Sequence, residues 1–349
     1  FDWLDNFCQA KGEAIGLYYN SQNGSLMINS PRTDNDFGGW ADMSCQMALF
    51  AEQLAETAEI IGEDTRVIYY QNRYQKITEV IREKLWHDED GFYYDLTSDG
   101  HPIRIKTTAG IPSSEDAPEL INHLKNDDEF ARRHLFPSLS ADEDGFKPNG
   151  AYWRGGVWGN ENYMIIAGLK RYGEYEFATT TAWNHITNME KIFTGYFPDT
   201  SLIDEKYWAN CNATVWELYS PENDQPGTRW DTYNLCRPNY IPTSGFGPVA
   251  MLIEDVLGFN VNGPDDQLTW RLWLLNKHGI RNLKFGNNLV TLWCEKRETK
   301  ESPVDIKGLT SSPFFLTIIL EQDTITIKQP RGRINISFKM EDIKKINKD

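Results

Sequence analysis

The chain has 349 residues, of which 40% are hydrophobic and 13% aromatic, with 12 Trp. This length suits one large domain, or one domain and a small second one. The formal net charge of −16 argues against nucleic acid and anionic membrane as partners. The five Cys form no C-x-x-C pair, so neither a zinc site nor a disulfide framework is indicated.

Apolar spacing predicts helices over much of residues 1–258. They are expected at 1–13, 42–62, 65–86, 115–135 (one or two short helices), 160–172, 174–194 and 244–257. A hairpin-like turn is expected within 86–95. Long loops alternate with short turns, which suits a helical toroid whose ligand loops gather on one rim.

The composition becomes β-rich after residue 265. Strands are expected at 268–274, 283–294, 314–320, 324–328 and 334–338. We therefore predict two regions, a helical one at 1–262 and a small β-rich one at 263–349.

The stretch Gly150–Tyr163 reads G-A-Y-W-R-G-G-V-W-G-N-E-N-Y. Aromatic faces can stack on the C–H faces of a sugar, and a guanidinium can donate to its hydroxyls. Glycines let the backbone approach a ligand closely. Ligand contact is predicted for Trp153, Arg154 and Trp158. The alternative is an aromatic hairpin that only packs between helices, with Trp158 pointing into the next helix.

A second polar loop covers residues 23–42. It carries three acids, Asp34, Asp36 and Asp42, and it also contains Arg32 and Trp40. These acids are candidates for general acids. The alternative is helix capping, above all for Asp42.

A third loop, 214–231, carries Glu217 between Trp216 and Tyr219. A carboxylate among aromatic rings can activate water, although a solvated surface acid is the alternative. Glu222 and Asp224, further along this loop, are expected to be solvated. Two carboxyl groups that face each other about 6.5–9.5 Å apart would suit inverting glycoside hydrolysis.

These stretches together resemble the (α/α)6-barrel glycosidases of the processing α-glucosidase I, bacterial α-glucosidase and mannosylglycerate hydrolase type, with distant kinship to trehalases. The resemblance rests on four stretches between about residues 15 and 295. They are N-S-P-R-T-D…G-G-W-A-D-M-S-C-Q-M-A, L-W-H-D-E-D-G-F-Y-Y-D, P-S-L-S-A-D…Y-W-R-G-G-V-W-G-N-E-N-Y and W-E-L-Y-S-P…S-G-F-G-P-V-A.

The resemblance implies an inverting hydrolase of an α-linked glucoside or mannoside, with Glu217 as the base and no cofactor or metal. The sugar subsite would then be shaped by Trp153, Arg154, Trp158 and Tyr219, with Arg229 and Trp230 at its edge. We also expect substrate contacts from Arg32, Asp36 and Trp40. The expected partner is an oligosaccharide or small glycoside.

Two departures from the family pattern matter. The family's acid loop commonly reads S-G-M-D-N-S-P-R, and here Ile28 stands where its general acid belongs. We expect Asp34, six residues further on, to take the role, with Asp36 as the other candidate. The alternative is a catalytically weak or silent sugar-binding protein.

The second departure is length, since about eight helices are expected where a full barrel has twelve. We therefore predict the C-terminal two thirds of a barrel, completed by an N-terminal segment or a second chain. The sequence leaves the compartment open between cytoplasmic and periplasmic or secreted.

Overall fold

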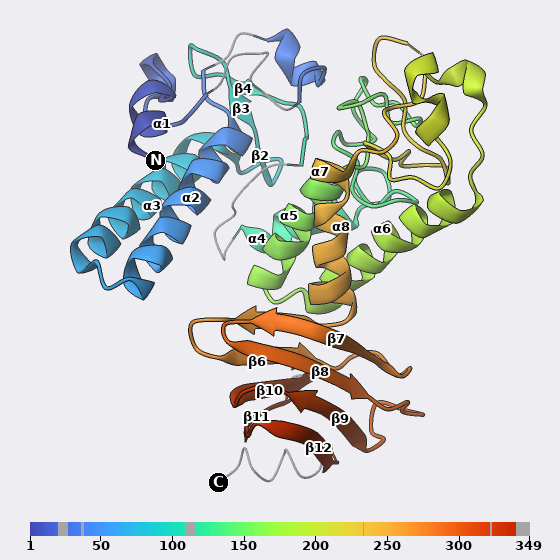
Figure 1. Ribbon diagram of the computed structural model, residues 1–349. Helices are drawn as coiled ribbons and strands as arrows, with labels where there is room; N and C mark the ends of the chain where they lie inside the picture. The colour runs from blue at the N-terminus through green and yellow to red at the C-terminus, as the bar shows by residue number, and fades with distance from the viewer. Residues whose placement is uncertain (20–26, 36–37, 109–115, 233, 322, 340–349) are drawn as a thin grey trace. The chain divides into compact units, whose positions relative to one another are not determined.

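The structure, a computed structural model, describes residues 1–19, 27–35, 38–108, 116–232, 234–321 and 323–339 (Figure 1). The chain divides into two compact units, Phe1–Pro248 and Val249–Asp349. The first is mainly helical, and the second is mainly β-strand. The predicted change from a helical to a β-rich region is therefore confirmed. The boundary predicted after residue 262 falls at the end of β5 (Phe259–Asn262), inside the second unit.

Two helix hairpins form the framework of the first unit (Figure 1). One joins α2 (Ala41–Ile60) to α3 (Asp64–Leu85), and the other joins α5 (Gly159–Arg171) to α6 (Tyr175–Gly195). The four helices confirm the predictions for 42–62, 65–86, 160–172 and 174–194.

Each hairpin turns at a glycine with a positive φ, Gly62 at 75° and Gly173 at 83°. In both turns the amide after the glycine bonds back to the preceding helix. Glu63 N donates to Ala58 O at 2.9 Å, and Glu174 N donates to Leu169 O at 3.0 Å. This is the glycine-closed end that the sequence indicated, because residues with a Cβ rarely adopt that conformation.

Shorter elements connect and flank these hairpins. They are α1 (Asp2–Phe7), η1 (Gly12–Ala14), η2 (Pro31–Asp34), β1 (Trp86–His87), β2 (Phe92–Tyr93), β3 (Asp95–Leu96), β4 (Pro102–Ile103), α4 (Ala117–Lys125), η3 (Thr200–Leu202), η4 (Glu205–Asn210), α7 (Ile241–Ser244) and α8 (Phe246–Ala250). The pairing of β1 with β2 confirms the hairpin expected at 86–95.

Three predicted helices are shorter than expected. The helix at 1–13 ends at Phe7, and the one at 115–135 is reduced to α4. The helix at 244–257 is divided among α7, α8 and η5 (Met251–Val256), a π-helical turn. Glycines are poor helix formers, and a Cβ at Gly247 would lie 2.5 Å from the Gly159 carbonyl oxygen. Packing therefore decides the course of this segment.

The second unit is a pair of four-stranded sheets around one apolar core. Its remaining strands are β6 (Gln267–Arg271), β7 (His278–Phe285), β8 (Asn288–Cys294), β9 (Val304–Thr310), β10 (Phe314–Leu320), β11 (Asp323–Gln329) and β12 (Gly332–Phe338). The orders are β11-β10-β6-β5 and β12-β9-β8-β7, and among the described strands only the β10–β6 pair is parallel.

The strand predictions fit β6, β10, β11 and β12. The strand expected at 283–294 is wrong as a single element, because the chain turns between β7 and β8 at Gly286, which has a φ of 49°. The sequence pattern does not predict β5 or β9. The described helices include none that is long and apolar enough to cross a membrane.

Candidate functional site

Glu217 lies in the interior of the first unit, with 3% of its surface exposed. Tyr152 donates its phenolic hydrogen to Oε1 of this carboxylate at 2.6 Å, and the Arg237 amide approaches Oε2 at 3.4 Å. The backbone is fixed as well, because Glu217 N donates to Arg237 O at 2.9 Å and its carbonyl accepts from the Ser244 hydroxyl. The solvated surface acid is therefore excluded.

Tyr152 reaches Glu217 from a tightly turned backbone. Gly150, Ala151 and Tyr152 have φ values of 93°, 35° and 64° in succession. A Cβ at Gly156 would lie 2.3 Å from the Tyr152 carbonyl oxygen, so this turn requires a glycine there. Burial and the neighbouring Glu217 raise the pKa of Tyr152 well above its usual range, which keeps the phenol a donor.

The indoles of Trp153 and Trp158 are stacked, with centroids 4.1 Å apart and planes inclined by 8°. Both are buried, at 4% and 5% exposed. Tyr152 meets Trp158 edge-on, with centroids 5.2 Å apart, and its ring is tilted against that of Trp230 at 4.8 Å. Trp230 is 45% exposed, so it offers more ring surface to solvent than the two indoles predicted to stack on sugar.

The loop at 27–35 is tied to this aromatic segment. Asn29 donates to the Ala151 carbonyl and accepts from the Trp153 amide, both at 3.0 Å. Met27 belongs to the same buried cluster, and Ile28 packs against it. Position 28, where the resemblance leads us to expect the family's acid, thus carries an apolar side chain that contacts the aromatic cluster.

Asp34 and Arg154, two of the predicted site residues, lie close together. Their charged groups are 3.8 Å apart, and their side chains are 73% and 30% exposed. Asp36 lies outside the described residues.

Arg32 and Trp40 are buried, each with 1% exposure. The Arg32 guanidinium pairs with Asp42 at 2.6 Å and with Asp95 at 3.0 Å, and it lies 4.7 Å from the centroid of the Trp40 ring. Asp95 also accepts the Ala41 amide at 2.7 Å. This group of residues fixes the start of α2.

Tyr219 and Arg229 complete the predicted set. Tyr219 is 1% exposed, and its backbone exchanges two hydrogen bonds with Val157. Arg229 pairs with Asp231 at 2.7 Å and lies over Trp230 at 5.9 Å. The structure thus gathers Glu217, Tyr219 and Trp230 around the aromatic segment.

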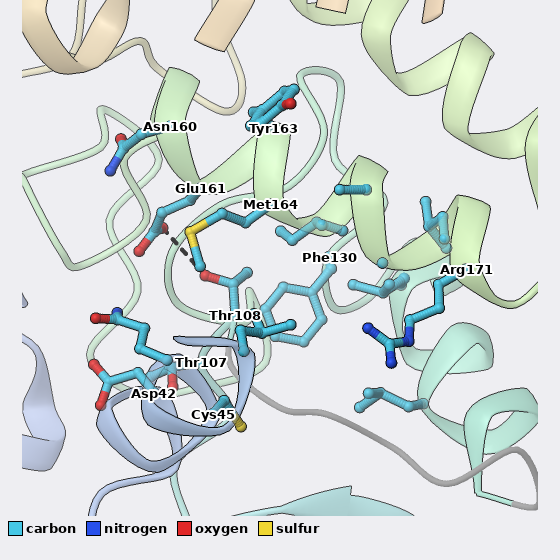
Figure 2. Close-up of a pocket in the computed structure, with 18 of the residues that line it drawn as sticks. Asp42, Cys45, Thr107, Thr108, Phe130, Asn160, Glu161, Tyr163, Met164 and Arg171 are labelled. Atoms are coloured by element: carbon cyan, nitrogen blue, oxygen red, sulfur yellow. Dashed lines mark hydrogen bonds between the residues drawn. The ribbon is translucent and has the colours of Figure 1, made fainter. Parts of the chain in front are cut away.

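A cavity of about 500 Å³ adjoins α2, α4 and α5 (Figure 2). Its walls are mostly apolar, and they include Met27 and Trp40. Two carboxyl groups also line it, those of Asp42 and Glu161. Burial raises the pKa of Glu161 to about 8.

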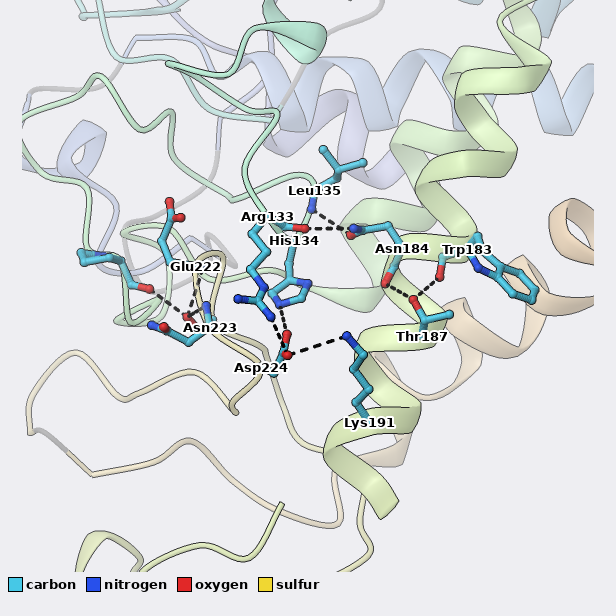
Figure 3. A network of polar contacts seen from close by, with 12 residues as sticks. Arg133, His134, Leu135, Trp183, Asn184, Thr187, Lys191, Glu222, Asn223 and Asp224 are labelled. Carbon is cyan, nitrogen blue, oxygen red and sulfur yellow. Dashed lines mark hydrogen bonds and ion pairs between the residues drawn. The ribbon is translucent and has the colours of Figure 1, made fainter. Parts of the chain in front are cut away.

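Asp224 holds the loop that follows Glu217 (Figure 3). Its carboxylate pairs with Arg133 at 2.6 Å, His134 at 2.9 Å and Lys191 at 3.7 Å. Burial alone would raise the pKa of Asp224, but these neighbours lower it. Asp224 is thus 34% exposed and also ion-paired, so the expected solvation is only part of its environment.

Glu222 follows the same pattern, since it pairs with Arg132 at 2.6 Å. Arg132, Arg133 and His134, the partners of these two acids, come from a segment in which no site residue is predicted. The run R-R-H in that segment could have indicated partners for these acids. Within the described ranges, no group of three or more His, Cys, Asp or Glu residues is arranged to hold a metal ion.

Comparison with known proteins gives the family of the chain. The profile of the mannosylglycerate hydrolase MGH1-like glycoside hydrolase domain matches residues 30–234, more than half of the chain. The chain belongs to this glycoside hydrolase family.

Among curated relatives, an uncharacterised protein of Borreliella burgdorferi is 26% identical over 92% of this chain and 66% of its own length. The mannosylglycerate hydrolase of Thermus thermophilus is 37% identical over 32% of this chain and 29% of its own. The match spans less than two thirds of either relative.

A solved structure, that of a mannosylglycerate hydrolase from Thermus thermophilus in complex with glucose, is 26% identical. It matches 60% of this chain and 45% of its own chain, with a TM-score of 0.43.

Proposed function

We propose that this chain carries the base of an inverting glycoside hydrolase that acts on an α-linked glucoside or mannoside, and that Glu217 is this base. The observation that supports it best is the burial of Glu217 beside the aromatic segment, with the Tyr152 phenol on one oxygen at 2.6 Å. Fixed donors hold a carboxylate in one orientation, which a base needs in order to take a proton from a positioned water.

In the proposed reaction, Glu217 accepts a proton from water while the water oxygen attacks the anomeric carbon. A second carboxyl group protonates the leaving oxygen on the other side of the sugar. Asp34 is the donor predicted from the sequence. Two carboxyl groups and a water suffice for this chemistry, so no cofactor is proposed.

The sugar would be bound by Trp153, Trp158 and Tyr219 as a rigid wall and by Trp230 as an exposed ring. Arg154 and Arg229 would donate to its hydroxyls at the edge. Arg32, Asp36 and Trp40 are the remaining candidates. The buried pairs of Arg32 favour a positioning role for that side chain. We further propose that the two helix hairpins are sectors of an (α/α)6 toroid.

The relatives named as mannosylglycerate hydrolases suggest the first substrate to test, an α-mannoside of glycerate. The protein and its Glu217→Gln variant are incubated with this compound and with methyl α-glucoside, and proton NMR follows the first anomer released. We expect the wild type to release the β-anomer and the variant to hydrolyse the substrate at least about 100-fold more slowly. Release of the α-anomer, or equal rates, would contradict the proposal.

A further inference from the structure

The proposed hydrolysis needs a protonated group opposite the base, and the residue at the family's acid position cannot supply one. Ile28 packs its apolar side chain against the aromatic cluster. Asp34 is 73% exposed and lies beside the Arg154 guanidinium. An exposed side chain of this kind lies in water rather than in the apolar surroundings that are typical of a glycosidase general acid.

We propose that Glu161, which nothing in the family pattern assigns, is the proton donor that replaces the acid missing at position 28. The assignment rests on the proposed function of Glu217. It is supported by three features of the described residues: the backbone frame shared by the two acids, the cavity that Glu161 lines, and the surroundings of its carboxyl group.

The backbone frame joins the segment that precedes Glu161 to the segment that follows Glu217. Val157 and Tyr219 exchange backbone hydrogen bonds of 2.9 and 3.0 Å as an antiparallel bridge. Because the bridge is antiparallel, the segment that leads forward from Val157 to Gly159 runs in the same direction as the segment that leads backward from Tyr219 to Glu217. Ser244 bonds to the Glu217 carbonyl through its hydroxyl, and its own carbonyl oxygen would lie 3.2 Å from a Cβ at Gly159.

Glu161 stands two residues beyond Gly159, in the first turn of α5. The two acids are therefore carried by backbone segments that the Val157–Tyr219 bridge joins. This is a rigid support of the kind that a pair of acid and base groups requires.

Met27 links the cavity that Glu161 lines to the aromatic cluster against which Ile28 packs. Met27, which precedes Ile28, lines this cavity with Glu161 and also belongs to the aromatic cluster that Ile28 contacts. Figure 2 shows the Glu161 carboxyl group pointing away from α5 toward Thr108. A cavity of about 500 Å³ is in the range of small-ligand sites.

The surroundings keep a proton on this carboxyl group near neutral pH. Burial raises the pKa of Glu161 to about 8, the nearby Asp42 raises it further, and Thr108 and Arg32 lower it. Arg171 is a further charged group that lines the cavity. A carboxylic acid held protonated by an apolar site is the usual arrangement of a glycosidase general acid.

The step balances as follows. The Glu161 proton passes to the glycosidic oxygen as the bond from that oxygen to the anomeric carbon breaks. Water forms the new bond to the anomeric carbon and gives its proton to Glu217. Transfer of one proton from Glu217 to Glu161 through solvent then restores both groups.

The test compares two leaving groups in the Glu161→Gln variant. Protonation is needed for a methyl α-glycoside but not for an α-glycosyl fluoride. We expect kcat/KM to fall about 100-fold or more for the methyl glycoside and to stay within a few-fold for the fluoride. The alkaline limb of the wild-type pH profile, expected near pH 8, should disappear.

The matched control is Glu176→Gln, because Glu176 is the exposed acid in the first turn of α6. It should leave both rates unchanged. Thr108→Val is a second test that keeps the acid. It removes the 3.2 Å bond from Thr108 Oγ1 to Glu161 Oε2, so the alkaline limb should move to higher pH.

Equal loss for both leaving groups, or no loss, overturns the assignment of Glu161. The assignment is also overturned if Asp34→Asn, rather than Glu161→Gln, loses activity on the methyl glycoside while keeping activity on the fluoride. A wild type that cleaves neither compound overturns the proposed function itself, which distinguishes the two failures.

Discussion

The Tyr152 hydroxyl donates a 2.6 Å hydrogen bond to Oε1 of Glu217, a residue 65 positions further along the chain. The tyrosine is presented from a left-handed turn and the glutamate from a segment held by Arg237 and Ser244. The bond therefore joins two loops that are each fixed by their own backbone. It places a carboxylate oxygen at a defined position beside the indole pair.

Replacing Tyr152 with Phe should keep the ring contacts and remove only this bond. A buried carboxylate that loses a donor costs about 1–3 kcal/mol, so the free energy of unfolding should fall by that amount. We expect kcat to fall about 10-fold or more, because Glu217 loses its orientation. Urea unfolding and steady-state rates measure the two effects. Unchanged values would show that this bond does not hold the base.

Placing an acid at position 28 should change both stability and activity. Ile28 packs against the aromatic cluster, so Ile28→Asp introduces a polar group that costs about 1–3 kcal/mol of folding free energy. The same carboxyl group would stand at the family's acid position. In a Glu161→Gln background it should restore at least about 10-fold of the lost rate on a methyl glycoside. Ile28→Asn is the control, since it is equally polar and cannot donate an acidic proton.

The pH dependence of stability tests the environment of Glu161 without any substrate. Its pKa is raised from 4.5 to about 8 in the folded protein, so the folded state binds more protons than the unfolded state between these values. The stabilisation that this group gives the folded state is therefore fully present below pH 4.5 and is lost as the pH rises through about 8.

Glu161→Gln removes this titration. The melting temperature of the variant minus that of the wild type should therefore increase from about pH 5 to about pH 8, because only the wild type loses stability over this range. Glu176→Gln serves again as the control, because its side chain is exposed. A difference in melting temperature between variant and wild type that stays constant with pH would contradict a raised pKa of Glu161.

The sequence predicted the elements that local pattern decides. Gly62 and Gly173 end their helices where expected, because the turn needs a positive φ. Glu217 could be picked out from its aromatic neighbours, but its burial could not, since Tyr152 and Arg237 are distant in sequence. The sequence pattern does not single out Glu161, because its raised pKa depends on a cavity assembled from several elements.

Arg32 is expected to be far more important for stability than Arg229. Arg32 is buried between Asp42 and Asp95, so Arg32→Met leaves two carboxylates without their cation and should cost about 3–5 kcal/mol. Arg229 pairs with Asp231 near the surface, and Arg229→Met should cost less than about 1 kcal/mol. Urea unfolding of both variants makes the comparison. Similar losses would contradict the buried role of Arg32.

Asp224 should control the mobility of the loop that follows the base. Its carboxylate gathers Arg133, His134 and Lys191, and these anchor the loop to α6 and to the segment before it. Arg133 and Lys191 are exposed to water, but Asp224→Ala leaves the buried His134 without its acceptor, which should cost about 1–3 kcal/mol of stability. Amide hydrogen exchange in peptides spanning residues 214–225 should become faster, because the loop loses its anchor.

The control for Asp224 is Glu174→Ala, which breaks an exposed pair with Lys125 and should cost less than about 1 kcal/mol. A purely structural role for Asp224 would lower stability and leave the rate per folded molecule unchanged. A positioning role should also lower kcat by about 10-fold with little change in KM, because Glu217 then spends less time in its productive orientation. Exchange in residues 214–225 that stays as slow as in the wild type would show that the loop is held by its backbone bonds instead.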